Sequence, residues 1–369
     1  MRSSVCEMFG IDLPIFAFSH CRDVVAAVSK AGGMGVLGAL AFSTEQLEIE
    51  LNWIDEHVDG KPYGVDVVMP ASYAGAGDLD PEHMAEQLAG MIPAEHKQFI
   101  DKVMDEYHVP PLPDDGEQVV GLLGWTHEGA RPQVDIALAH PIRLLVNALG
   151  PPPRDIVDLA HEHGVKVAAL VGSPQQAQRQ VNQGVDIIVA QGHEAGGHTG
   201  EISTMVLVPQ VVEAVAPVPV LAAGGIGNGK QMAAAIALGA DGVWTGSIWL
   251  TVAESDMTPT IVEKLLEATS RDTVRSRCMT GKPARQLRTG WTDAWDRPDA
   301  PGTLPMPLQY MATAEAQRRI ARSGIRELVG IPVGQIVGAM DAVRPARDVI
   351  FDMVSEFLDA TERLKDLQT

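Results

Sequence analysis

Cysteine, aromatic residues and positive charge are scarce in this sequence, and each shortage excludes a class of protein. The 369 residues include three cysteines, Cys6, Cys21 and Cys278, with no CxxC pair and no Cys/His metal spacing. A disulfide framework and a cysteine-based metal site are therefore not expected. Aromatic residues make up 5% of the chain, unlike an aromatic-rich β-sandwich. Lys and Arg number 28 against 48 Asp and Glu, a net charge of −20, so nucleic acid and anionic membranes are not expected partners.

Long apolar runs are also missing. No stretch reaches the roughly 18 uncharged apolar residues of a membrane span, and Glu7 and Asp12 interrupt any signal-peptide core near the start. Together with the cysteine usage, this predicts a cytoplasmic protein without a membrane partner.

What the chain has in abundance is short apolar runs separated by helix-length segments. The runs lack strict alternation, which is typical of strands buried on both faces of a parallel sheet. Eight βα units in succession predict an α/β fold, a (β/α)8 TIM barrel, with an open doubly wound sheet as the alternative. The eight runs are residues 15–17, 35–37, 64–68, 144–147, 166–170, 187–190, 220–222 and 243–245.

Two stretches interrupt this rhythm. Residues from about 71 to 140 are rich in Pro, Asp and Glu with weak helical periodicity, which predicts an insertion over the barrel mouth. Residues from about 256 to 310 carry Gly, Pro and basic turns before a helical pattern begins near Ala312. We therefore expect a barrel over residues 1–255, a small inserted cap domain over 256–310, and a helical C-terminal tail over 311–369 that packs back on the barrel.

The segment QGHEAGGHTG, residues 191–200, directly follows an apolar run and predicts a ligand-facing loop, because glycine permits close approach of a ligand to the backbone. A zinc-binding HExxH helix would place the second histidine four positions after the first, but His198 follows His193 by five, so a metal site is rejected. Catalytic groups of barrels collect after strand ends. His198 is therefore a candidate catalytic residue, the alternative being a solvent-facing loop histidine, and Glu194 is expected only to orient the loop.

The segment VPVLAAGGIGNGK, residues 218–230, nearly spells a nucleotide-binding loop. Gln231 stands where that loop needs a hydroxyl for Mg²⁺, and the glycine spacing also fails the dinucleotide fingerprint. A strand, the turn Gly224-Gly225 and a helix amino terminus remain, and these suit one phosphate monoester.

The next βα unit repeats this chemistry in DGVWTGSIWL, residues 241–250. Thr245 and Ser247 offer hydroxyl groups, and Gly246 offers an exposed amide. Barrels commonly build a phosphate site from the loops after strands 7 and 8, where the strand count independently places these two segments. A single phosphate site without a Mg²⁺ loop indicates FMN as the cofactor.

Positive charge is concentrated in residues 271–288. These residues either form a solvated basic face that balances the acidic insertion, or an anion-binding cap for a charged substrate. The six basic residues, against Asp272 as the one acid, are Arg271, Arg275, Arg277, Lys282, Arg285 and Arg288.

The glycine-rich segments, in this order, resemble the nitronate monooxygenase family, formerly called 2-nitropropane dioxygenases. The resemblance is specific over about 165–253, in KVAALVGSPQQA, GVDIIVAQGHEAGGHTG and PVLAAGGIGNGKQMAAAIALGADGVWTGS. It is looser in PIFAFSH, AGGMGVLGA, YGVDVVMP and TGKPARQLR, whose order fits the whole chain. The family fold is an FMN-binding (β/α)8 barrel with a small extra domain, in agreement with the strand count.

Carried over position by position, the resemblance implies His198 as the active-site base. Three departures concern the flavin surroundings: Ala17-Phe18-Ser19-His20 replaces Ala-Pro-Met, Asp66 stands where Asn is usual, and 246–249 reads GSIW instead of GTRF. FMN binding stays expected, the substrate is left open, and His20 is a candidate additional pocket histidine. The implied FMN contacts are Asp66, Gln191, Gly196, Gly225, Trp244, Thr245, Gly246 and Ser247.

The reaction that the resemblance implies is oxidation of an alkyl nitronate by O₂ to a carbonyl compound and nitrite. His198 would stabilise the nitronate anion as a cation or donor, or remove the α-proton of a neutral nitroalkane, while FMN carries the electrons. The expected partners are a small-molecule substrate, a nitronate or an acyl thioester, and O₂, and a homo-oligomer is left open. Three alternatives stay open: an FMN-dependent NAD(P)H enoyl-thioester reductase, a flavin-binding protein without turnover, and a phosphate-binding barrel lyase or isomerase without flavin.

Overall fold

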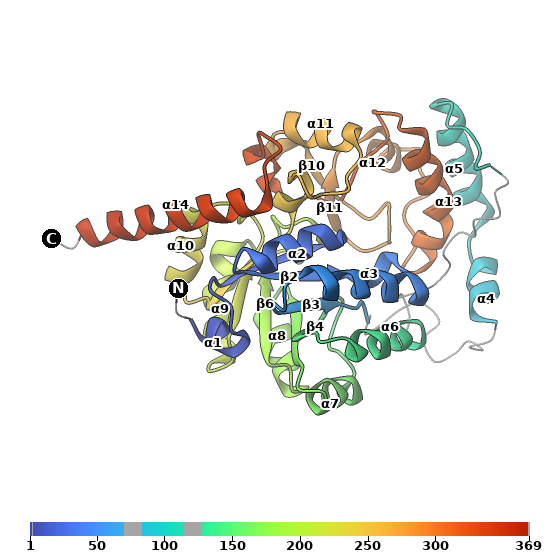
Figure 1. Cartoon of the computed structure of the whole chain (residues 1–369). Coiled ribbons are helices and arrows are strands. Elements are labelled where there is room, and N and C mark those ends of the chain that lie inside the picture. Colours follow the sequence, from blue (N-terminus) through green and yellow to red (C-terminus); the bar gives the residue numbers. More distant parts are fainter. Residues whose placement is uncertain (2, 70–82, 114–126, 368–369) are drawn as a thin grey trace.

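Eight parallel strands close into a barrel in a computed structural model that describes residues 1, 3–69, 83–113 and 127–367 (Figure 1). Strands β9 and β1 close the ring, where Trp244 pairs with Phe16. This confirms the predicted (β/α)8 barrel and excludes the open sheet, and each of the eight apolar runs overlaps one strand. The strands, in their order around the barrel, are β1 (Ile15–Ser19), β2 (Met34–Gly38), β3 (Tyr63–Asp66), β4 (Leu144–Asn147), β5 (Lys166–Val171), β6 (Ile187–Gln191), β8 (Val220–Ala223) and β9 (Gly242–Thr245).

Alternate side chains along each strand point into the barrel or toward the surrounding helices. Val65 of β3 belongs to the core shared with the helices, so its neighbour Asp66 points inward. Val36 of β2, Val189 of β6 and Trp244 of β9 lie in the cluster that fills the barrel. By this alternation the last inward positions at the carboxyl ends include Phe18, Gly38, Asp66, Leu170 and Gln191.

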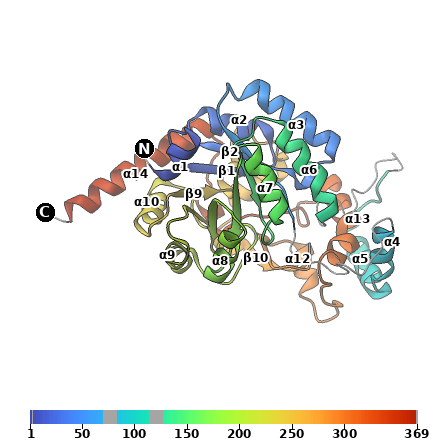
Figure 2. The same cartoon turned by 90° about the horizontal axis from the view of Figure 1, so that it is seen from below.

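Helices surround the barrel on all sides, as seen from below in Figure 2. Polar side chains fix where several of them begin: Ser43, Ser173 and Asn228 each accept a hydrogen bond from a first-turn amide. The surrounding helices are α2 (Arg22–Lys30), α3 (Thr44–His57), α6 (His127–Ala139), α7 (Arg154–Glu162), α8 (Pro174–Asn182), α9 (Thr204–Val215) and α10 (Gly229–Ala237), while α1 (Ser4–Phe9) packs against the lower barrel interior. No helix of the described ranges is long and apolar enough to cross a bilayer.

Helix α6 corrects the expected insertion over 71–140. Ala130, Val134, Ala137 and Leu138 of α6 lie in the main core, so this helix is part of the barrel ring. Its periodicity was weak because two of these positions are alanine and Pro132 lies among them. Of the rest of that range, residues 70–82 and 114–126 lie outside the described residues, and α4 (Met84–Gly90) and α5 (Ala94–Glu106) pack against α13 (Leu308–Ser323).

A second region covers the carboxyl ends of the strands. Its sheet has the order β10 (Thr273–Ser276), β11 (Ala284–Leu287) and β7 (Gly197–His198), so the barrel loop after β6 contributes one strand to it. Trp291 and Trp295 of α12 (Gly290–Trp295) centre a separate apolar cluster, which α5 and α13 complete. Helix α11 (Pro259–Glu267) lies above this sheet in Figure 1.

The C-terminal helices divide between the two regions. Helix α14 (Ala346–Asp366) packs against α10 and extends past the barrel (Figure 1). Helix α13 differs from the expected tail on the barrel, because its Ala316 and Ile320 are buried in the tryptophan cluster.

Candidate active site

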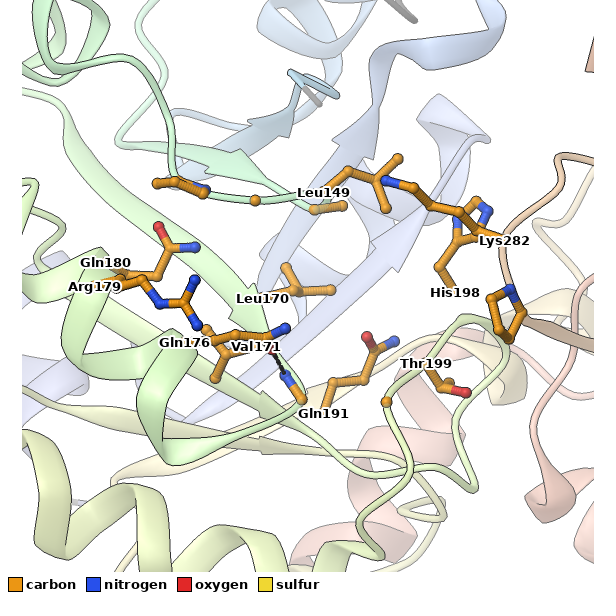
Figure 3. Close-up of a pocket in the computed structure, with 16 residues that line it drawn as sticks. Leu149, Leu170, Val171, Gln176, Arg179, Gln180, Gln191, His198, Thr199 and Lys282 are labelled. Atoms are coloured by element: carbon orange, nitrogen blue, oxygen red, sulfur yellow. Dashed lines mark hydrogen bonds between the residues drawn. The ribbon is translucent and has the colours of Figure 1, made fainter. Parts of the chain in front are cut away.

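A cavity of about 400 Å³ opens at the carboxyl ends of β4, β5 and β6 (Figure 3). In Figure 3, His198 and Lys282 lie on one side of it, and Arg179 and Gln180 of α8 lie on the other. The lining residues come from both the barrel and the covering region: Ala148, Leu149, Gly150, Pro151, Leu170, Val171, Gly172, Gln176, Arg179, Gln180, Gln191, His198, Thr199, Gly200, Lys282 and Pro283.

His198 is held by the covering region although it follows a barrel strand. Its backbone pairs with Ala284 of β11, and its Nε2 lies 2.7 Å from Thr280 Oγ1. The loop before it lies directly on another segment, because a Cβ on Gly196 would lie 2.9 Å from the main-chain nitrogen of Gly334. The glycine at position 196 is therefore explained by backbone packing, and the histidine has a fixed position.

The imidazole of His198 is neutral near pH 7. Burial and, secondarily, the charge of Lys282 lower the pKa of His198 to about 4. Burial also lowers the pKa of Lys282, and no carboxylate of the described residues pairs with its ammonium group. A neutral imidazole can accept a proton, and the charged group that lines this side of the cavity with His198 is Lys282.

The turns after β8 and β9 leave space beside main-chain amides. Gly225 has a φ of 70°, in the region that favours glycine. A Cβ on Gly225 would have only the Glu194 Cβ near it, at 3.7 Å, and one on Gly246 would have nothing within 4 Å. Among the described residues, no acceptor is matched to the N–H groups of Gly225, Gly246 or Ser247. This arrangement fits an anionic group held by main-chain donors.

The side chains of two other predicted FMN contacts, Thr245 and Trp244, already interact with neighbouring residues of the barrel. The Thr245 hydroxyl donates to the Phe16 carbonyl and accepts from Trp249 Nε1, each at 2.9 Å. The Trp244 ring stacks against Phe16 and Phe18 inside the barrel. These two residues can therefore offer a ligand their main chain at most.

Several polar groups around these turns already have hydrogen-bond partners within the protein. Ser247 Oγ accepts from the Gly334 amide at 2.8 Å. At the start of α10, the Gly227 amide donates to Gln231 Oε1 at 2.8 Å, and the Gly229 amide donates to Glu356 Oε2 at 2.9 Å. The expected contribution of this helix terminus to phosphate binding is thus smaller than the sequence suggested. Gly224 has a φ of 99° and a Cβ on it would lie 3.0 Å from the Gly192 carbonyl oxygen, so it forms the turn itself.

Asp66 and Gln191 end β3 and β6 on the inner side of the barrel. Gln191 lines the cavity. Asp66 is 3% exposed, and its Oδ1 has no hydrogen-bond partner among the described residues. Burial raises the pKa of the Asp66 carboxyl to about 7. This Oδ1 oxygen is therefore available to accept or share a hydrogen bond with a bound group.

His20 lies at the end of β1, near the same mouth. In the tautomer with a proton on Nδ1, it donates to the Gly38 carbonyl at 2.9 Å, and burial lowers its pKa. The Glu194 carboxylate accepts from the Thr204 amide, at the first residue of α9, at 3.0 Å. No group of three or more His, Cys, Asp or Glu side chains that could bind a metal occurs in the described part of the chain.

The basic segment is mostly structural. Arg275 pairs with Glu201 at 2.7 Å, Arg288 pairs with Asp293 at 2.7 Å, and the buried Arg285 donates to the His193 carbonyl at 3.0 Å. Of the six basic residues, only Lys282 lines the cavity. The sequence analysis did not identify Thr280, which was marked only by its position two residues before Lys282 in TGKPARQLR. It also did not identify Arg179 and Gln180, which no motif marked.

The family model for nitronate monooxygenase matches residues 4–356. This chain belongs to the nitronate monooxygenase family. A Mycobacterium tuberculosis protein named as a monooxygenase is 54% identical, over 100% of this chain and 99% of its own length. A probable nitronate monooxygenase of Staphylococcus aureus is 27% identical, over 96% of this chain and 97% of its own length.

Two solved structures extend this relationship. Nitroalkane oxidase from Streptomyces ansochromogenes has a TM-score of 0.80 and 26% identity, covering 98% of this chain and 100% of its own. FabK from Thermotoga maritima has a TM-score of 0.75 and 28% identity, covering 100% of this chain and 99% of its own. Membership in the nitronate monooxygenase family identifies the chain as a flavin-dependent oxidoreductase acting on a small molecule, which removes the flavin-free lyase or isomerase from the alternatives.

Proposed function

We propose that this member of the nitronate monooxygenase family binds FMN and oxidises alkyl nitronates with O₂ to a carbonyl compound and nitrite. The observation that supports the proposal is that the barrel mouth has main-chain donors on one side and ionisable side chains on the other. On one side, the amides of Gly225 and Gly246, which have no acceptor among the described residues, border open space. On the other side, a neutral His198 lies beside the cation of Lys282.

The chain's residues fit FMN in particular. Gly224-Gly225 and Gly246-Ser247 would hold the phosphate through main-chain donors, which suit a monoester without a metal ion. Asp66 and Gln191 would meet the polar edge of the ring, and the Oδ1 of Asp66 that lacks a partner among the described residues supports this. Gly196 and Trp244 would border the cofactor through their main chain. When bound there, FMN supplies the redox chemistry between substrate and O₂.

The protein's own part is binding, charge and proton transfer. The Lys282 ammonium attracts the nitronate anion into the cavity. When the substrate arrives as a neutral nitroalkane, a ring nitrogen of His198 accepts the α-proton, and Thr280 Oγ1, at 2.7 Å from Nε2, fixes the plane of the ring. Leu149 and Leu170 provide apolar walls that limit water. The buried, free cysteines Cys6, Cys21 and Cys278 support a cytoplasmic location.

The test is spectroscopic and then catalytic. Purified protein should be yellow, and a nitronate should bleach its flavin anaerobically without NADH or NADPH. With air present, nitrite should be released. Denatured protein should give up FMN rather than another flavin. A colourless protein that refuses added FMN would refute the proposal.

The likeness to FabK and the position of Arg179 across the cavity from His198 favour one second candidate, an FMN-dependent NAD(P)H reductase of enoyl thioesters. Arg179 could then bind a phosphate at the far end of an extended substrate. NADH or NADPH oxidation that depends on an enoyl thioester, without nitrite from nitronates, would select this function instead.

A further inference from the structure

We propose that Asp66 binds the flavin as a neutral carboxylic acid that donates its O–H to an acceptor on the isoalloxazine ring. This inference rests on the FMN binding proposed above. It assigns a protonation state to a contact that the family resemblance gave only as a position, and it explains how an acid can stand where the family usually has an amide.

The geometry places the carboxyl group at the barrel mouth. Asp66 is the last residue of β3, and its register partners are Gly38 on β2 and Val146 on β4. Because Val65 faces the helices, Asp66 faces the interior, at the level where β6 presents Gln191 to the cavity. The side chain is buried with an oxygen that has no partner among the described residues.

The surroundings disfavour a carboxylate. Neither Gly38 nor Val146, the residues across β2 and β4, carries a charge. The titratable groups of the described residues around the mouth include His20 beyond Gly38, His198 with Lys282 at the covering region, Arg179 and Glu194. None of them contributes to the shift of Asp66, whose pKa burial raises to about 7. An ionised carboxyl group here would therefore be buried without a compensating charge.

The chemistry of the cofactor selects the same state. The pyrimidine part of an isoalloxazine carries two carbonyl oxygens and unprotonated ring nitrogens that accept hydrogen bonds, and one N–H group that donates. An Asn amide can donate to these acceptors, and so can a carboxylic acid of nearly the same shape, but a carboxylate has no proton to give. Asp66 can take the place of the usual Asn as a donor to such an acceptor only while it is protonated.

This predicts FMN affinity that weakens as pH rises. The dissociation constant for FMN should be measured for the wild type and for Asp66→Asn between pH 6 and 9, by flavin fluorescence and ultrafiltration. Since the protonated form is the one that binds, linkage predicts a weakening of about tenfold or more in the wild type. The Asn variant should change much less. It is a matched control, because ionisation of the FMN phosphate affects both proteins equally.

Two measurements do not depend on the variant's activity. The flavin-free wild type should lose thermal stability relative to Asp66→Asn as pH rises from about 4 to about 7, because the folded state holds a proton in this range that the unfolded state has released. The FMN-loaded wild type should show an infrared C=O stretch of a protonated carboxyl group that disappears at high pH, and this test stands even if the variant does not fold.

Parallel pH profiles of FMN affinity in the two folded proteins would overturn the inference, as would the absence of the protonated-carboxyl band. Failure of both proteins to bind FMN at any pH would instead refute the proposed function, and the inference with it. The two failures are thus distinguishable.

Discussion

The two sides of the barrel mouth are built in different ways. The side over β8 and β9 consists of main-chain amides from two adjacent βα turns, with Gly225 and Gly246 leaving space beside them. The side over β4 to β6 consists of side chains from distant parts of the chain, such as His198 and Thr280, which are 82 positions apart and 2.7 Å from each other. We infer that the first side binds a constant feature of the cofactor. The second side sets substrate preference, which small changes in the covering region can alter.

The largest expected effect comes from placing a side chain in the space beside the main-chain amides over β8 and β9. Gly246→Leu should remove FMN and all activity, because its side chain would occupy the space beside the amides, where an added Cβ meets nothing within 4 Å. We expect the dissociation constant for FMN to rise by about a hundredfold or more, as expected when binding at several main-chain donors is blocked. Absorbance of the purified protein and titration with FMN measure this.

Gly90→Leu is the matched control for this change, since a Cβ there also meets nothing within 4 Å and the residue lies at the end of α4. It should keep its flavin. A yellow, fully active Gly246→Leu protein would show that the phosphate lies elsewhere.

A substitution among the side chains that line β4 to β6 should instead lower turnover and leave FMN bound. His198→Asn should keep FMN but lower turnover of a neutral nitroalkane by about 10²- to 10⁴-fold, the usual contribution of a general base. Steady-state kinetics and the flavin spectrum separate the two properties. His163→Asn, on the exposed end of α7, should leave both unchanged, and an unimpaired His198→Asn enzyme would end the assignment of the base.

Lys282→Met tests how the charges of this side cooperate. Burial and the Lys282 charge hold the pKa of His198 at about 4, so wild-type turnover of a nitroalkane should not fall between pH 8 and 5.5. Removing the ammonium raises the pKa of His198 toward its usual value, and the acid limb of the pH profile should move to higher pH. The KM for an anionic nitronate should rise about tenfold, from loss of one partly buried charge interaction.

The surface pair Lys102 and Asp299 supplies the control, because Lys102→Met removes an equal charge far from the cavity lining. An unchanged pH profile in Lys282→Met, with an unchanged KM, would mean that Lys282 does not act on the site.

The sequence predicted the barrel better than the region that covers it, and the reason is physical. A parallel strand buried on both faces needs an uninterrupted apolar run, so strands such as β5 and β6 can be located by composition alone. The tryptophan cluster joins α5, α12 and α13, and no local pattern indicates which distant segments will pack together.

The same contrast applies to the site. Glycine turns such as Gly224-Gly225 follow from local chemistry, and the sequence identified them. Whether Thr245 faces a ligand or bonds to Phe16 depends on packing in three dimensions, and so does the fact that Lys282 alone of six basic residues reaches the cavity. Thr280 was missed because its partner His198 comes from another region.

The smallest expected effect tests that contact. Thr280→Val should lower kcat for a neutral nitroalkane by about three- to tenfold, the range of one hydrogen bond, while FMN stays bound. The hydroxyl positions the imidazole, so the loss should appear in kcat and in the pH profile rather than in KM. Thr280→Ser should restore kcat because serine keeps the hydroxyl group. Thr361→Val on α14, whose hydroxyl donates to the Leu358 carbonyl of the same helix, controls for loss of a threonine hydroxyl. If Thr280→Val matched the wild type in both kcat and pH profile, Thr280 of the covering region would not orient the base. The functional side chains on this side of the mouth would then be His198 and Lys282 alone.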